Sequence, residues 1–268
     1  MDIIKKLAQE LAIKEEQAKA AVQLIDEGNT IPFIARYRKE MTGALNDETL
    51  RNLHERLLYL RNLEEKKEQV INAITDQGKM TEDLKEKILS AETLVAVDDL
   101  YRPYRPKKQT RATKAKEKGL EPLANILLLQ KTTKSMEEEA AAFVNAEKGV
   151  ANAKEAIAGA KDIIAEMIAD MADYRKSIRN CTMKQGSLVV KAKDEKAESV
   201  YEMYYDFREP LSKVTGYRVL AINRGEKEKF LTVKVEAPDV QIVNALNKTM
   251  VQDNPNTKVL LEEAVLDA

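Results

Sequence analysis

The sequence predicts a mostly α-helical protein, and three observations support that fold class. A third of the 268 residues are charged, while glycine and proline are scarce, with nine and seven copies. Ala, Leu, Glu and Lys, which favour helices, are abundant. Apolar residues recur at steps of three and four along most of the chain, whereas the alternation typical of strands occurs in two short runs. We therefore expect a multi-helical chain with one long central helix and a small two-stranded β element near the C-terminus.

Composition also excludes several classes of protein. The single cysteine, Cys181, cannot form an internal disulfide, which fits a reducing compartment. No apolar run approaches the roughly 20 residues of a membrane span, and the N-terminus lacks the apolar core of a signal peptide. We expect a cytoplasmic protein that has no membrane partner.

Residues 1–130 are expected to form an N-terminal helical region. Within it, residues 3–25 predict two short amphipathic helices, and residues 28–43 predict a connection with an apolar plug and a basic tip. Leucines at three- and four-residue steps then predict a long helix from Asn46 to about Gln77.

The middle of that long helix breaks the apolar pattern. The series continues there with Glu64 and Lys67, so we expect this part of the helix to be more solvated than its ends. His54, the only histidine, has no cysteine or second imidazole nearby. This favours a partly exposed helix residue over a metal ligand or a catalytic base.

Residues 131–268 are expected to form a second helical region that contains the β element. Residues 188–193 and 230–236 predict two strands that pair, the tyrosine-rich run 196–207 predicts a helix, and residues 217–226 fit a helix better than a strand. The chain stops inside its last predicted helix without a cap, so we expect a truncated chain with a further domain beyond it. The remaining helices are predicted over residues 81–90, 120–130, 135–144, 153–171, 173–183, 239–250 and 258–266. Asn46, Thr81, Ser135 and Asn152 are the expected caps of the helices that follow them.

The basic segment, residues 101–118, is the strongest functional lead. It carries eight Lys or Arg against one acidic residue, a net charge of +7, whereas residues 1–100 and 119–268 carry −5 and −3. Cations of this kind can neutralise nucleic-acid phosphates. The candidate nucleic-acid-binding residues of this segment are Arg102, Arg105, Lys107, Lys108, Arg111 and Lys114.

Proline and capping residues predict the backbone of the basic segment. Pro103 and Pro106 favour extended or polyproline II backbone over residues 101–107, with tyrosines on one edge and arginines on another. Thr110 and Gly119 predict the start and stop of a short helix. The alternative is a rigid strap packed on the helical core, whose cations are solvated or paired with acidic helices.

A second basic group lies at the end of the predicted connection over residues 28–43. Its cations Arg36, Arg38 and Lys39 follow the apolar plug. They are either a further nucleic-acid contact or ion-pair partners of Glu40, Asp47 or Glu48.

Motifs for catalysis are absent from the sequence. It has no glycine-rich phosphate loop, no paired cysteine or histidine spacing for a metal, and no nucleophile elbow. Asp98 and Asp99 are adjacent, and neighbours on a helix point about 100° apart, so the two carboxylates do not converge on one atom. We expect a protein that is not an enzyme and holds neither a metal nor a cofactor.

Three long blocks carry a family resemblance. They are GNTIPFIARYRKEMTGALND (28–47), VDDLYRPYRPKKQTRATKAKEKGLEPLA (97–124), and AESVYEMYYDFREP followed by YRVLAINRGEKEKFL (197–231). In sequence and order they resemble the N-terminal part of the Tex family of bacterial transcription accessory proteins. The blocks extend over nearly the whole chain and are long enough to be specific.

The resemblance implies a helix-turn-helix-like part and a protein that binds RNA or DNA around transcription. It also implies that a ribonuclease-H-like YqgF domain, helix-hairpin-helix motifs and an RNA-binding OB-fold domain follow this region. The sequence departs from the family at Thr215-Gly216-Tyr217, where a proline and a histidine are expected.

Two functions are consistent with these observations. The first is a nucleic-acid-associated module that contacts phosphates without reading bases, and that binds RNA or DNA weakly in the absence of the downstream domains. The alternative is a helical interaction scaffold that positions those domains or contacts the transcription machinery, with its Lys and Arg solvated.

Overall fold

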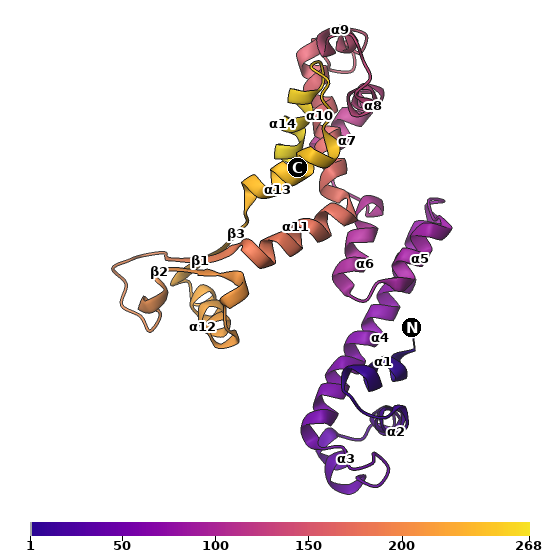
Figure 1. Cartoon of the computed structure of the whole chain (residues 1–268), viewed down its shortest axis with the longest axis vertical. Coiled ribbons are helices and arrows are strands. Elements are labelled where there is room, and N and C mark those ends of the chain that lie inside the picture. The colour runs from indigo at the N-terminus through magenta and orange to yellow at the C-terminus, as the bar shows by residue number, and fades with distance from the viewer. Residues whose placement is uncertain (1) are drawn as a thin grey trace. The chain divides into compact units, whose positions relative to one another are not determined.

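A computed structural model describes residues 2–268 and confirms a mostly α-helical protein (Figure 1). Its contacts divide the chain into two compact units, with the division between Tyr104 and Arg105. Unit 1 contains α1 (Ile3–Glu10), α2 (Glu15–Asp26), α3 (Ile31–Tyr37), α4 (Asp47–Asp76), α5 (Glu82–Ser90), α6 (Leu94–Tyr101) and the 3₁₀ turn η1 (Arg102–Tyr104).

The long helix α4 organises unit 1, as predicted. Asn46 caps its start, since its side chain accepts a hydrogen bond from the Thr49 amide at 2.7 Å, and Gly78 follows its end with φ +67°. The other helices pack along it (Figure 1). Its buried face consists of Leu50, Leu53, Leu57, Leu60, Leu63, Lys67, Val70 and Ile74.

The prediction of a solvated middle in α4 is wrong, because Lys67 is only 1% exposed. Its ammonium donates to Glu64 Oε1 and to the carbonyl of Leu89, both at 2.8 Å. A buried ammonium is tolerated only when its donors are satisfied. The backbone carbonyl at the end of α5 supplies the partner that sequence periodicity cannot reveal.

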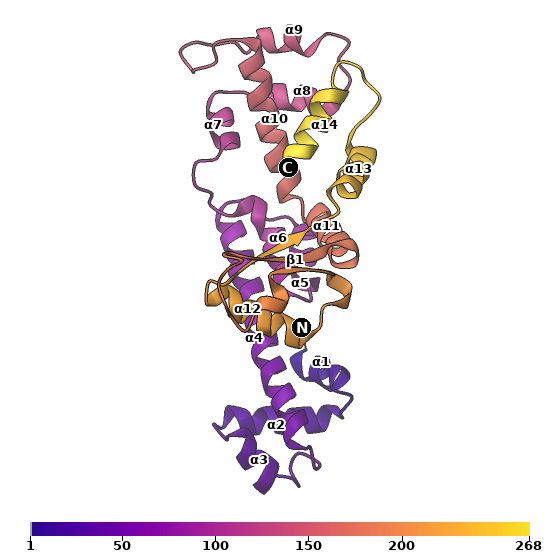
Figure 2. The ribbon, with the colours of Figure 1, turned by 90° about the vertical axis from the view of Figure 1, so that its left-hand side faces the viewer.

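Unit 2 is built from helices and one small sheet. Helix α10 is its hub and packs against α7, α8, α9 and α14 (Figure 2). The elements are α7 (Arg111–Glu117), α8 (Glu121–Leu129), α9 (Met136–Ala141), α10 (Ala153–Asp170), α11 (Ala172–Gln185), β1 (Ser187–Ala192), η2 (Glu202–Tyr204), β2 (Asp206–Pro210), η3 (Leu211–Lys213), α12 (Gly216–Lys227), β3 (Leu231–Glu236), α13 (Asp239–Met250) and α14 (Lys258–Asp267).

The sheet has three antiparallel strands in the order β2-β1-β3. Strands β1 and β3 pair as predicted, with Val190 opposite Val233. The predicted tyrosine-rich helix over residues 196–207 is wrong, because this run forms the short turn η2 and enters β2. Its aromatic rings pack on the sheet instead, since Tyr201 and Tyr204 belong to the same buried hydrophobic cluster as Val190.

Two further expectations concern the helices. Residues 217–226 lie within helix α12, as favoured from the sequence. Among residues 2–268, no helix combines the length and the apolar character needed to cross a bilayer.

Candidate nucleic-acid interface

The predicted binding residues are divided between the two units. Arg36, at the end of α3, and Arg38 and Lys39, which follow it, belong to unit 1. Arg102 also belongs to unit 1 but adjoins α6, which contacts the later part of α4. The remaining candidates, Arg105, Lys107, Lys108, Arg111 and Lys114, belong to unit 2.

The predicted polyproline II backbone is wrong over residues 102–104, which form the 3₁₀ turn η1. Arg102 stays in the α region at φ −52° and ψ −43°, because its amide still donates to the Asp98 carbonyl and thereby extends α6. The restriction that a following proline imposes is a preference, and this hydrogen bond overrides it. Tyr101 and Tyr104 pack against the core of unit 1, as expected for a strap.

The short helix α7 forms as predicted from its termini. Thr110 caps it through a reciprocal pair of hydrogen bonds with Thr113, and Gly119 follows it with φ +81°. Ala112 and Ala115 are buried against α10, so the basic side chains of α7 remain at its outer faces.

An acidic face of α10 neutralises part of the basic segment. Asp162, Glu166 and Asp170 are four residues apart, so they lie on one face of the helix. The ammonium of Lys107 hydrogen-bonds to Asp170 and lies 3.3 Å from Glu166 Oε1. The structure therefore supports the alternative of paired charges for this lysine.

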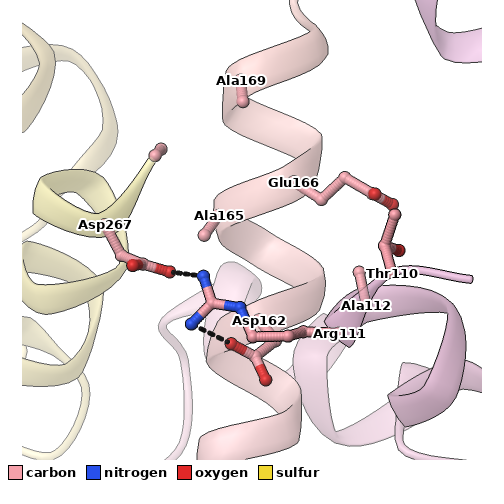
Figure 3. A pocket seen from close by; sticks show the side chains of 9 residues that line it. Thr110, Arg111, Ala112, Asp162, Ala165, Glu166, Ala169 and Asp267 are labelled. Atoms are coloured by element: carbon pink, nitrogen blue, oxygen red, sulfur yellow. Dashed lines mark hydrogen bonds and ion pairs between the residues drawn. The ribbon is translucent and has the colours of Figure 1, made fainter.

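Arg111 is held in the same way from two helices (Figure 3). Its guanidinium lies 2.6 Å from Asp267 Oδ2 on α14 and 3.3 Å from Asp162 Oδ1 on α10. The hydrogen bond to Asp267 and the charges of both aspartates raise the pKa of Arg111 above its ordinary value. These residues line an open pocket of about 190 Å³ together with Thr110 and Glu166.

The paired state of Lys107 predicts a difference from its neighbour Lys108. We expect Lys107→Glu to reduce the free energy of unfolding by ~1–3 kcal/mol, because the new carboxylate faces Glu166 and Asp170 and leaves them unpaired. Lys108→Glu changes the charge identically at an exposed position, and we expect an effect within ~0.5 kcal/mol. Urea denaturation followed by circular dichroism measures the free energy of unfolding of both variants. Equal losses of stability would contradict the ion pairing of Lys107.

The other cations of the segment differ in their surroundings. Arg102 and Arg105 are exposed but already engaged in interactions. Lys108 and Lys114 are exposed and, within residues 2–268, make no hydrogen bond or ion pair with a carboxylate. A further cation that the sequence did not single out is Lys148, whose ammonium lies beside Gly119 at the end of α7.

A group of exposed cations without carboxylate partners lies on the α3 tip, which we define as residues 36–41. The sequence predicted only a connection here, but the segment includes helix α3. Thr30 and Pro32, at the N-cap and second position, are signals that could have revealed this helix. Ile34 is fully buried and anchors the helix on the core, as the predicted plug requires.

The turn after α3 is held by polar contacts. Thr42 is fully buried, and its amide and hydroxyl both donate to the Arg38 carbonyl, at 3.2 and 3.3 Å. From α2, the Gln17 amide donates to the carbonyls of Thr42 and Gly43 at 3.2 and 2.9 Å. These bonds fix the direction in which the tip projects.

The cations of the tip lack the carboxylate partners that the alternative required. Asp47 instead pairs with Arg51 at 2.7 Å. The Arg38 guanidinium donates to the Tyr37 carbonyl at 3.2 Å and lies 5.1 Å from the centroid of the Phe33 ring. Within residues 2–268, neither Arg36 nor Lys39 makes an ion pair, and both are exposed. Three positive charges are therefore available at this place, beside the single negative charge of Glu40.

Comparison with known proteins gives this helical chain a class and a family. Residues 1–75 match the model of the Tex-like protein N-terminal domain, and residues 131–263 match the Tex central region-like model. These matches define a chain composed of two Tex-type regions. The chain belongs to the Tex family, as the three sequence blocks indicated. The basic segment 101–118 lies between the two matched regions, whereas the α3 tip lies inside the first.

Individual relatives agree with this assignment. The chain is 41% identical over 266 residues to the uncharacterized protein YdcI of Bacillus subtilis, covering 98% of this chain and 37% of the relative. It is 41% identical over 239 residues to the transcriptional accessory protein Tex of Neisseria gonorrhoeae, covering 88% and 31%. It is 32% identical over 248 residues to the human S1 RNA-binding domain-containing protein 1, covering 89% and 24%. The chain thus spans about a third of the length of the bacterial relatives.

Proposed function

We propose that this chain is a nucleic-acid-associated module of a transcription accessory protein, and that it contacts phosphates without reading bases. The observation that carries the proposal is the set of three cations on the α3 tip, Arg36, Arg38 and Lys39, which have no carboxylate partner within residues 2–268. Exposed cations of this kind bind phosphates and release counterions.

Unit 2 offers a second and smaller set of proposed phosphate contacts. Lys108 and Lys114 are exposed and unpaired within residues 2–268, so they are available to a phosphate backbone. Lys107 and Arg111 are excluded from the proposed contacts, because binding there would first require breaking ion pairs with α10 and α14. The proposed interface is therefore smaller than the +7 charge of the basic segment suggests.

The names of relatives support the class of ligand. The human relative is named for an S1 RNA-binding domain, and the gonococcal relative is named a transcriptional accessory protein. We accordingly propose RNA or DNA as the partner and the cytoplasm as the location, with no membrane partner. The proposal includes no catalytic step, no metal and no cofactor.

A scaffold function is the second candidate, and one observation favours it. Lys107 and Arg111 make ion pairs with acidic residues of α10 and α14, which supports a structural role for part of the basic segment. In this alternative, the helices position other domains or contact the transcription machinery.

Fluorescence anisotropy across a salt series separates the two candidates. With single-stranded RNA and with duplex DNA, we expect the logarithm of affinity to fall with the logarithm of salt concentration. For single strands the expected slope is between about −2 and −4, because three to five cations each contribute about −0.7. Absence of binding at low salt, or binding that ignores salt, would contradict the phosphate-contact proposal and favour the scaffold.

A further inference from the structure

Tyr37 is the feature of the α3 tip that phosphate binding does not explain. It ends helix α3, and the residue is 60% exposed although most of the ring is apolar. It is flanked in sequence by Arg36 and Arg38, and Lys39 follows. An aromatic ring displayed among cations combines the two groups that proteins use to hold single-stranded nucleic acid.

The Tyr37 ring contacts a second aromatic ring and still remains largely exposed. The centroids of Tyr37 and Phe33 lie 5.3 Å apart, with the ring planes tilted by 47°. The Arg38 guanidinium lies over the Phe33 ring, 5.1 Å from its centroid. Phe33, Tyr37 and Arg38 therefore form a small cluster, and Tyr37 remains largely exposed although it contacts Phe33. Such contacts restrict the ring before binding, so they lower the entropic cost of ordering it when a partner packs on it.

We propose that Tyr37 stacks on a nucleic-acid base, so that the α3 tip binds unpaired nucleotides. This inference rests on the proposed phosphate contacts and adds the kind of strand to them. Bases inside a duplex are stacked on one another and offer no free face, whereas unpaired bases can stack on an aromatic ring. Arg36, Arg38 and Lys39 lie close enough in sequence to Tyr37 to contact phosphates on either side of the stacked nucleotide.

An abasic strand separates stacking from charge. It carries the same phosphates as an ordinary oligothymidylate of equal length but has no bases. At about 50 mM salt, we expect the wild-type chain to bind the ordinary strand roughly 5- to 100-fold more tightly than the abasic strand, the range expected for one stacked base. Tyr37→Leu is expected to abolish that difference, whereas Tyr37→Phe keeps the ring and is expected to retain it.

Tyr37→Trp gives an independent spectroscopic signature. The chain contains no tryptophan, so the introduced indole is its only one. A base stacked on this indole is expected to quench its fluorescence, while the abasic strand at saturating concentration leaves the emission nearly unchanged. A purely structural role for Tyr37 would not produce this difference. Circular dichroism checks that each variant folds, as expected at an exposed position.

The outcomes distinguish this inference from the function on which it rests. If Tyr37→Leu loses the preference for the base-containing strand but keeps the wild-type salt dependence, stacking is supported. If the wild-type chain binds, but Tyr37→Leu shows the same preference as the wild type, the stacking role is overturned and the phosphate contacts stand. If the wild-type chain binds neither strand at low salt, both proposals fail.

Discussion

Replacing Arg36, Arg38 and Lys39 together by glutamate is expected to weaken binding of single-stranded RNA by about 100-fold at low salt. Each exposed ion contact contributes roughly 1 kcal/mol to the free energy of binding. Each new glutamate also repels the phosphates, which offsets the contribution of the remaining contacts. The fold should survive, because all three side chains are exposed and none makes an ion pair within residues 2–268. Anisotropy titration measures the affinity, and circular dichroism measures the helical content.

A matched variant controls for the change in net charge. Lys19, Lys79 and Lys85 are also exposed lysines of unit 1, on or beside α2, α4 and α5, and they lie outside the α3 tip. Their joint replacement by glutamate alters the net charge equally. We expect it to reduce affinity by less than about fivefold, through long-range repulsion alone. Equal losses in the two variants would mean that binding responds to total charge and that the α3 tip has no special role.

Gly159→Val is expected to reduce the free energy of unfolding by about 2–4 kcal/mol. Gly159 lies where α10 meets the helices that carry and follow the basic segment. A Cβ at this position would lie 2.4 Å from Leu120 Cδ1 and 3.2 Å from Ala115 Cβ. Leu120 is 1% exposed, so its side chain has little room to move away. The substitution therefore separates α10 from α7 and α8.

The adjacent residue provides the control for this substitution. Ala158 is exposed on the same helix, so Ala158→Val introduces a β-branched residue without the clash. We expect this control to reduce the free energy of unfolding by no more than ~0.5 kcal/mol. Urea denaturation of both variants, followed by circular dichroism, measures the difference. Similar stabilities would show that α10 does not pack as closely on Leu120 as the structure indicates.

Local signals allowed most helices to be predicted from the sequence. Asn46, Thr81, Ser135 and Asn152 each cap the helix that was expected to follow them. These predictions succeeded because a cap and the amide that it accepts from are three residues apart, so the sequence contains both partners.

Several failures have a different cause, which is distance along the chain. Lys67 is buried because the carbonyl of Leu89, 22 residues later, accepts a hydrogen bond from its ammonium. Residues 206–210 form a strand because they pair with β1, although the tyrosine-rich residues before them have a helical pattern. Arg111 is paired with Asp267, 156 residues away. Sequence periodicity carries no information about such partners, so it could name the cations but not say which remained available.

The most direct test of the central claim is the salt dependence of RNA binding by the wild-type chain and by the triple α3-tip variant. Phosphate contacts by Arg36, Arg38 and Lys39 predict that the slope of log affinity against log salt becomes shallower by about 2 in the variant, because three contacts at about 0.7 each are lost. The triple-lysine control is expected to keep the wild-type slope. An unchanged slope in the α3-tip variant would contradict the claim and assign any binding to other residues.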